Sequence, residues 1–305
     1  MKKLLILVFL LFFLVAGYRV YLSFSKSVWD GKNRINLVFV NPQIFIFSLN
    51  DPEQEAVVLF LPSQTFIEVI HGYGQYRAEA VYQLGEIENH RGGELLADSL
   101  QESLGIPVDG FAAISNFQFP ISKDKPKDGI LAAFRLLLKG GQTNLTKWDL
   151  LRLWWEFRKI RQDKVVVVEL EKTGVLAKTI LPDGSEGFEI EPEKTEKIAQ
   201  EILKDQKIRQ EDLTIAILNG TSHSGLAEKG ARIIKNIGGR VVEMGNTENG
   251  KCQIRGEKKF KKSYTVKKLM EIFRCQWGGE DLGSHRAEVI LILGEDYWKR
   301  LTEKW

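Results

Sequence analysis

One loop in the C-terminal third has residue types that bind anions. It reads Asn219-Gly220-Thr221-Ser222-His223-Ser224-Gly225 and joins a predicted strand to a predicted helix. Backbone N–H groups in such a loop and at the helix N-terminus can hold a phosphate or a carboxylate. The loop has no Gly-Lys-Ser/Thr of a P-loop, and Ser224 stands where Gly-x-Ser-x-Gly needs its last glycine. Its candidate ligand-binding residues are Asn219, Gly220, Thr221, Ser224 and Gly225. The alternative is a tight turn with Ser224 as the helix N-cap.

A basic segment between residues 251 and 275 is the second candidate binding surface. It carries nine Lys or Arg against two Glu, a net charge of +7. Lys258, Lys259, Lys261 and Lys262 stand together in it. Outside the cytoplasm, such a charge would meet an anionic polymer or lipid head groups. A solvated charged loop is the alternative.

Composition excludes several classes of protein. The chain has 305 residues, 44% hydrophobic and 27% charged, which is ordinary for a globular protein. Its 43 basic and 40 acidic residues give +3, too even a balance to indicate nucleic-acid binding. Four histidines and two cysteines exclude a Cys-rich zinc module. We therefore predict no metal, no cofactor and no nucleic-acid partner.

The N-terminus has the pattern of a membrane anchor. Lys2 and Lys3 precede a fourteen-residue run without a polar side chain, LLILVFLLFFLVAG. Lysines before an apolar run place the N-terminus in the cytoplasm. We expect a single-pass transmembrane helix that binds the cytoplasmic membrane through residues 4–24, with the bulk of the chain outside the cytoplasm. A cleaved signal peptide is the alternative. Export would permit a disulfide between Cys252 and Cys275, although separate reduced thiols are slightly favoured.

Hydrophobic patterning predicts an α/β protein. After the anchor at 1–24 and a polar stalk at 25–32, β-branched runs indicate strands, and helices are predicted in GELLADSLQESLG, twice between residues 127 and 162, and in EKTEKIAQEILKDQ. Together they indicate a mixed α/β domain over 33–200. One of its runs, VVLFL, is typical of a strand buried on both faces. A linker at 201–212 leads to a smaller domain at 213–305. There the order β-α-β-β-α-β predicts a four-stranded sheet with its helices on one face.

The tryptophan-rich segment 146–157 is predicted to be a helix. Thr146 and Asp149 form a capping-box-like start. Trp148, Trp154 and Trp155 widen its apolar face. We expect this face to pack in the core. The alternative is an aromatic wall of a lipid pocket.

The last 90 residues resemble the C-terminal domain of LytR-CpsA-Psr (LCP) proteins. The resemblance is carried by Ile217-Leu218-Asn219-Gly220-Thr221, then Ser224-Gly225-Leu226-Ala227, Gly245-Asn246 and Leu293-Gly294-Glu295-Asp296. The N-terminal half resembles an LCP catalytic domain, most clearly in Ser103-Leu104-Gly105-Ile106-Pro107-Val108-Asp109. The resemblance implies an LCP-like mixed α/β fold before the smaller sandwich domain.

The resemblance also implies an activity, but in this chain residues that the activity requires are replaced. Active LCP members transfer a glycopolymer from a polyprenyl-pyrophosphate lipid to peptidoglycan, with arginines on the pyrophosphate and Asp residues on Mg²⁺. The family's Pro-Arg-Asp-Thr reads Pro62-Ser63-Gln64-Thr65 here. A second family segment, Arg-Ser-Asp-Thr, has no counterpart near Val40-Asn41-Pro42-Gln43. The family's Arg-x-x-Arg-Gln is matched by Arg158 and Arg161, which could still bind phosphate.

We therefore expect a degenerate, non-catalytic LCP-like protein of the cell envelope, without catalytic residues. Its expected partners are an anionic envelope polymer, peptidoglycan or a polyprenyl lipid. One alternative is an active transferase that uses displaced residues. Another is an exported adaptor with only fold-level similarity.

Overall fold

The computed structural model describes most of the chain. The described residues are 24–40, 43–89, 91–114, 125–180, 184–248 and 250–304, with Phe9, Leu11, Leu14, Val15, Gly17 and Tyr18. Most of the expected anchor over residues 4–24 lies outside them. None of the helices found in the described residues is long and apolar enough to span a bilayer.

A six-stranded mixed sheet forms the centre of the N-terminal part, residues 25–202, in the order β7-β6-β1-β2-β3-β8. Its strands are β1 Ile35–Val40, β2 Ile44–Asn50, β3 Glu55–Leu61, β6 Gly110–Ala113, β7 Gln142–Thr143 and β8 Val165–Glu169. The three central strands are buried on both faces because each face meets its own apolar layer. This confirms the burial predicted for VVLFL.

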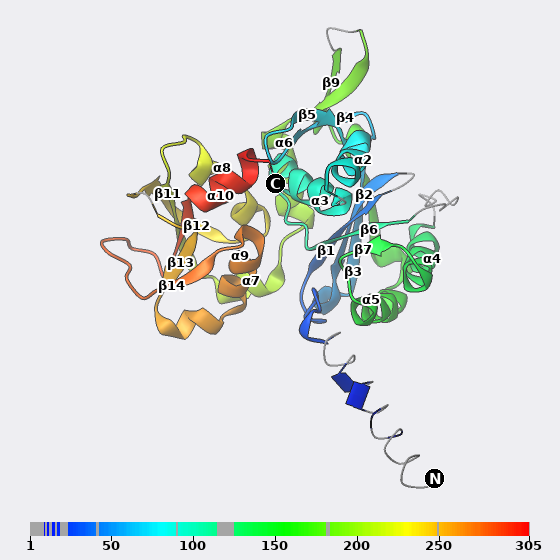
Figure 1. Cartoon of the computed structure of the whole chain (residues 1–305), viewed down its shortest axis with the longest axis horizontal. Helices are drawn as coiled ribbons and strands as arrows, with labels where there is room; N and C mark the ends of the chain where they lie inside the picture. The colour runs from blue at the N-terminus through cyan, green and yellow to red at the C-terminus, as the bar shows by residue number, and fades with distance from the viewer. Residues whose placement is uncertain are drawn as a thin grey trace.

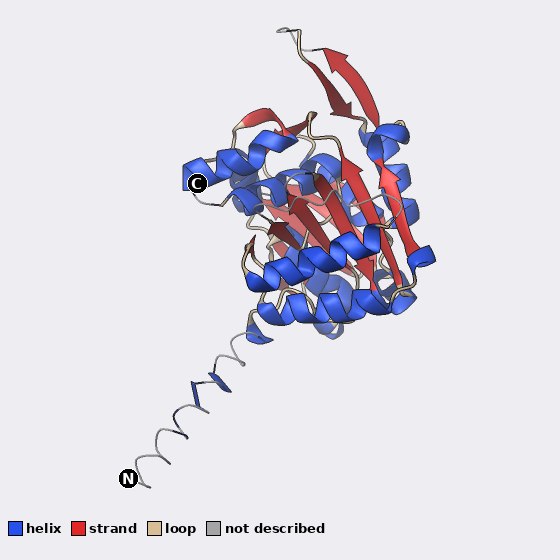
Figure 2. Ribbon diagram, turned by 90° about the vertical axis from the view of Figure 1, so that its right-hand side faces the viewer, coloured by secondary structure: helices blue, strands red, loops and turns tan. Residues whose placement is uncertain are grey.

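The two faces of this sheet pack against different elements (Figures 1 and 2). One face packs on α4 Pro126–Lys139 and α5 Lys147–Lys159, around Phe47, Phe134 and Phe157. The other packs on helices and on a small sheet of order β5-β4-β10-β9. These elements are α2 Ala78–Asn89, α3 Gly92–Leu104, α6 Pro192–Ile202, β4 Thr65–Val69, β5 Gly74–Arg77, β9 Leu176–Ile180 and β10 Glu186–Ile190. Short 3-10 turns join several of them: η1 Asp51–Glu53, η2 Gln162–Lys164 and η3 Leu170–Lys172.

The C-terminal part, residues 206–304, is built on a five-stranded sheet of order β12-β11-β15-β13-β14. Its elements are α7 Gln206–Glu211, β11 Thr214–Gly220, α8 Leu226–Asn236, β12 Arg240–Asn246, β13 Gln253–Gly256, η4 Lys258–Lys262, α9 Tyr264–Phe273, β14 Gln276–Gly279, β15 Val289–Gly294 and α10 Glu295–Thr302. Helices α8, α9 and α10 share one core on one face of the sheet, as predicted.

The sheet differs from the four-stranded prediction by one strand. β14 pairs in parallel with β13, and β15 lies between β13 and β11. Two βαβ units, β11-α8-β12 and β13-α9-β14, are thus joined through β15. The sequence did not reveal β14 because its four residues, QWGG, have no apolar alternation.

Cys252 and Cys275 form a disulfide, with their Cα atoms 4.9 Å apart. It joins the start of β13 to the end of α9, because that helix runs back along its strand. The slight preference for separate thiols was therefore wrong.

Candidate functional site

The turn Pro62-Ser63-Gln64 between β3 and β4 opens onto a surface pocket of about 730 Å³. The pocket is formed by the β3–β4 turn, the N-terminal end of α2, the 3-10 turn η3 and the β9–β10 hairpin. Its lining residues are Pro62, Ser63, Gln64, Glu79, Glu171, Lys178, Thr179, Ile180, Glu186, Gly187 and Phe188. An adjoining hollow of about 240 Å³ adds Gln43 and Glu169.

The charge of this pocket is negative. Glu79, Glu171 and Glu186 line it, and Lys178 is the single basic side chain among its described lining residues. A pyrophosphate needs fixed cations close to its oxygens, so it would meet net repulsion here. In the described part of the chain, no group of three or more His, Cys, Asp or Glu is placed to hold a metal ion.

Arg158 and Arg161 lie at the other end of the central sheet. They precede β8, which runs parallel to β3, whereas Ser63 follows the C-terminal end of β3. Arg161 forms an exposed ion pair with Asp163, and the Arg158 guanidinium lies 5.5 Å from the Trp154 ring centroid. The fold therefore does not bring these arginines to the Ser63 pocket.

Helix α5 begins at the predicted capping box. The Thr146 hydroxyl accepts from the Asp149 backbone N–H, and the Asp149 carboxylate accepts from the Thr146 N–H. The expectation of a wholly packed aromatic face was wrong, because Phe157 is buried while Trp155 is 53% exposed. The tryptophans do not line the pocket beside Ser63 either.

Much of the hydrogen-bonding capacity of the Asn219–Gly225 loop is used by hydrogen bonds within the loop. The Asn219 carboxamide oxygen accepts from the Thr221 N–H and hydroxyl, and its amino group donates to the His223 carbonyl. The Thr221 hydroxyl accepts from the His223 N–H. Gly225, at φ 83°, occupies the N-cap position of α8, so the prediction of Ser224 as N-cap was wrong. The exposed loop positions include Ser224 and Gly225.

His223 has partners that the sequence did not reveal. Its ring stacks on Trp298 of α10 with centroids 4.0 Å apart, and its Nε2 lies 3.8 Å from a Glu295 carboxylate oxygen. Both residues come from the helix after β15, which parallel pairing with β11 brings beside this loop.

The four clustered lysines lie on the 3-10 turn η4. Lys258, Lys259, Lys261 and Lys262 precede α9, and none of them is buried. Lys259 pairs with Glu257. The +7 segment divides in space, however, because Lys268 and Arg274 face the N-terminal part instead of this turn.

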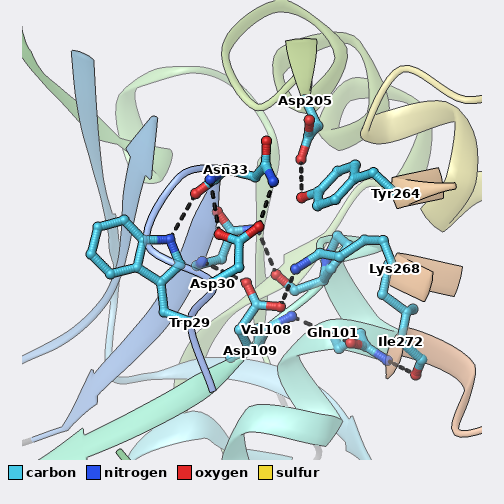
Figure 3. Close-up of polar contacts among 12 residues, drawn as sticks. Trp29, Asp30, Asn33, Gln101, Val108, Asp109, Asp205, Tyr264, Lys268 and Ile272 are labelled. Atoms are coloured by element: carbon cyan, nitrogen blue, oxygen red, sulfur yellow. Dashed lines mark hydrogen bonds and ion pairs between the residues drawn. The ribbon is translucent and has the colours of Figure 1, made fainter. Parts of the chain in front are cut away.

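The contact between the two parts, here called the seam, is made by α3 and residues 105–109 against α8, α9 and α10. The Lys268 ammonium pairs with the Asp109 carboxylate, and both side chains are about one-tenth exposed, at 9% and 10%. Asp109 also accepts from the Asn36 N–H at 2.8 Å. Figure 3 shows this pair beside Gln101, which donates to the Ile272 carbonyl. The Leu104–Asp109 motif is thus the docking edge of the N-terminal part.

Further contacts extend the seam. Asn236 donates to the Gly105 carbonyl at 2.9 Å, and the Tyr297 hydroxyl donates to Glu102 at 2.8 Å. The Arg232 guanidinium also donates to the Glu102 carbonyl. Seam residues also line two adjoining cavities of about 370 and 280 Å³.

Burial shifts the seam's titrating groups. Burial alone would lower the pKa of Lys268, but the Asp109 carboxylate outweighs it and raises that pKa. Burial raises the pKa of Glu102, against the opposing hydrogen bond from Tyr297. Burial, followed by the nearby Asp205 carboxylate, raises the pKa of Tyr264, whose hydroxyl donates to Asp205. The raised pKa of Lys268 favours its charged form opposite Asp109, whereas the raised pKa values of Glu102 and Tyr264 favour their neutral forms.

Residues 212–297 match the family model LytR_C, described as "LytR cell envelope-related transcriptional attenuator". The chain carries a LytR-type C-terminal domain. This LytR-type domain contains the Asn219 loop, the η4 lysines and the C-terminal side of the seam, apart from the end of α10. The resemblance inferred from ILNGT and LGED is thereby confirmed.

Several solved structures are similar to the chain at low identity, among them TagT, whose structure is described as a LytR-CPS2A-psr family protein. The B. subtilis TagT structure is 14% identical, covers 57% of this chain and 91% of its own, and has a TM-score of 0.41. B. subtilis TagV is 11% identical, covering 56% and 95%, with a TM-score of 0.40. A transcriptional regulator from Enterococcus faecalis is 9% identical, covering 70% and 91%, with a TM-score of 0.42. No curated protein matches the chain in sequence.

Sequence reasoning missed two groups of residues. The seam was missed because Asp109 and Lys268 are 159 positions apart. The pocket carboxylates were missed because Glu79, Glu171 and Glu186 come from separate elements. A usable signal for the seam was Asp109 itself, a charged residue at the entrance to an apolar strand.

Proposed function

We propose that this chain is a membrane-anchored, extracytoplasmic envelope protein. Its N-terminal part is of LCP type and does not catalyse glycopolymer transfer. Its LytR-type domain is docked on that part through the seam. It acts by binding an envelope polymer or its lipid carrier during wall assembly.

The negative pocket beside Ser63 is the observation that carries this proposal. Ser63 and Gln64 occupy the place of the family's Arg and Asp. The surrounding side chains supply Glu79, Glu171 and Glu186 in place of further cations. Losing a preorganised charge clamp costs several kcal/mol of transition-state stabilisation. Adding carboxylates nearby raises that cost.

The proposed polymer contact is on the LytR-type domain. The η4 lysines are its densest group of exposed cations, and they fit a polyanion. TagT has been solved with bound octaprenyl pyrophosphate lipid, which supplies the matching probe for the N-terminal pocket.

The test is a turnover assay on the full chain in detergent. The donor is a polyprenyl-pyrophosphate-linked glycan with Mg²⁺ and peptidoglycan, and released polyprenyl phosphate is measured by mass spectrometry. We expect no release above a protein-free control. Turnover that depends on the protein and on Mg²⁺ would make the transferase the correct function.

A binding comparison sharpens this result. Combined Glu79→Gln, Glu171→Gln and Glu186→Gln changes should raise affinity for octaprenyl pyrophosphate, because they remove the repulsion. The matched control changes the exposed residues Glu193, Glu201 and Glu228 to Gln and should leave affinity unchanged. Equal effects of the two sets would show that net charge, and not the pocket, governs binding.

A further inference from the structure

Helix α5 exposes large apolar side chains that the core does not bury. Its inner side, with Leu150, Leu153 and Phe157, fills the core beneath the sheet. On the outer side Leu151 is 46% exposed and Trp155 is 53% exposed. The α5 face comprises Lys147, Trp148, Leu151, Arg152, Trp154, Trp155, Arg158 and Lys159.

The charges of the α5 face are all positive. At 100° per residue its members fill one continuous arc of the helix without a carboxylate. Of the helix's two acids, Asp149 is buried in the capping box and Glu156 is ion-paired with Lys159. Such a face fits an anionic surface.

The cations of the α5 face lie over its rings. The Arg152 guanidinium is 5.9 Å from the Trp148 centroid, and the Lys159 ammonium is 6.0 Å from the Trp155 centroid. Arg135 of α4 adds a guanidinium 5.4 Å from Trp154. Tryptophan rings with adjacent Lys and Arg are the side chains that occupy a membrane–water interface.

The chain enters the fold beside this face. The Phe24 ring, at the end of the N-terminal apolar run, lies 4.6 Å from the Trp148 ring. The following residues are fixed to the start of α5, because Ser27 and the Val28 N–H both donate to Asp149. The α5 face is therefore held where the predicted anchor would leave the bilayer.

We propose that the α5 face lies on the anionic lipid surface of the membrane that holds the anchor. Trp155 sits among the head groups, with Trp148 and Trp154 half-buried beside it, and the lysines and arginines contact lipid phosphates. This inference rests on the anchoring given under the proposed function. In Figure 1, α5 and the β9 hairpin lie at opposite ends of the N-terminal part. The Ser63 pocket, which that hairpin lines, is then held away from the bilayer and toward the wall.

The experiment places nitroxide labels on the full chain in lipid nanodiscs. Leu151→Cys reports on the α5 face, and Ile180→Cys, a site 71% exposed on β9, is the matched control. In nanodiscs that contain phosphatidylglycerol, we expect the label at 151 to collide with a water-soluble nickel reagent about fivefold less often than the label at 180. Changing Lys147, Arg158 and Lys159 to Gln should restore much of that access.

Retention of the chain on the membrane after an alkaline carbonate wash separates the test of the anchor from the test of the α5 face. A retained chain whose label at 151 is as accessible as that at 180 would overturn the α5 inference and leave the anchor intact. A chain released by the wash would overturn both. Shielding at 151 that is unchanged by the three Gln substitutions, or equal in pure phosphatidylcholine, would overturn the assignment to anionic lipid.

Discussion

The seam and the Ser63 pocket use charge in opposite ways. At the seam, Asp109 and Lys268 are buried and paired. In the pocket, Glu79, Glu171 and Glu186 surround open space with one lysine among the lining residues. A buried pair costs stability when one partner is lost, whereas exposed like charges cost little. The difference identifies the seam as a structural contact and the pocket as an open surface.

The largest effect should come from Asp109→Ala. It leaves the Lys268 ammonium and the Asn36 N–H without their partner inside the seam. We expect the free energy of unfolding to fall by about 3–5 kcal/mol. Urea unfolding of the full chain in detergent, followed by tryptophan fluorescence, measures it.

The exposed Arg161, changed to Ala, is the control for this variant and should have a far smaller effect. Adding Lys268→Met to Asp109→Ala should recover part of the loss, because the orphaned charge is removed. Equal losses from Asp109→Ala and Arg161→Ala would show that the Asp109–Lys268 pair contributes no more to stability than an exposed arginine does.

A smaller loss is expected from Gly105→Ala. Gly105 has φ +67°, and an added Cβ would lie 2.8 Å from Arg232 Nε and 3.0 Å from Asn236 Nδ2. We expect a loss of about 1–2 kcal/mol from the backbone alone, with a further loss from this contact. Gly174→Ala is the matched control, because its φ is +75° and its Cβ would meet nothing within 4 Å. The excess of Gly105→Ala over Gly174→Ala in the same unfolding assay measures the contact, and no excess would mean that the seam tolerates the methyl group.

The raised pKa of Glu102 predicts that the free energy of unfolding depends on pH. Burial raises its pKa above the ordinary 4.5, so the folded chain holds this proton more tightly than the unfolded chain. Its contribution to stability is therefore lost as pH rises above about 4.5. Glu102→Gln should stabilise the protein at pH 7 and flatten the slope of stability against pH. Glu94→Gln, on the exposed side of the same helix, should change neither, and a similar response of both variants would contradict the assignment.

The smallest change in stability should come from the η4 lysines. Changing Lys258, Lys259, Lys261 and Lys262 to Gln should alter the unfolding free energy by no more than about 0.5 kcal/mol. Binding to poly(glycerol phosphate), measured by calorimetry, should nevertheless be lost, and binding by the unchanged chain should weaken with salt. Four exposed lysines elsewhere, Lys172, Lys194, Lys229 and Lys235, provide the charge-matched Gln control. Equal loss of binding in both variants would show that only net charge matters.

The sequence by itself determined the local elements and the C-terminal domain. Buried runs such as VVLFL, the capping box at Thr146 and the stop at Gly105 act within a few residues, so their patterns are visible in the chain. The signatures ILNGT and LGED also indicated the LytR-type domain, and the family match over residues 212–297 confirms it.

Only the tertiary structure decided which residues meet. It brought Asp109 to Lys268, gathered three carboxylates around Ser63, placed Arg158 at the opposite end of the sheet and turned Trp155 of α5 outward. Each outcome depends on the order of the strands in the sheets or on which face of a helix packs against the core. Those are properties of packing between distant segments, and a one-dimensional pattern of residue types does not specify them.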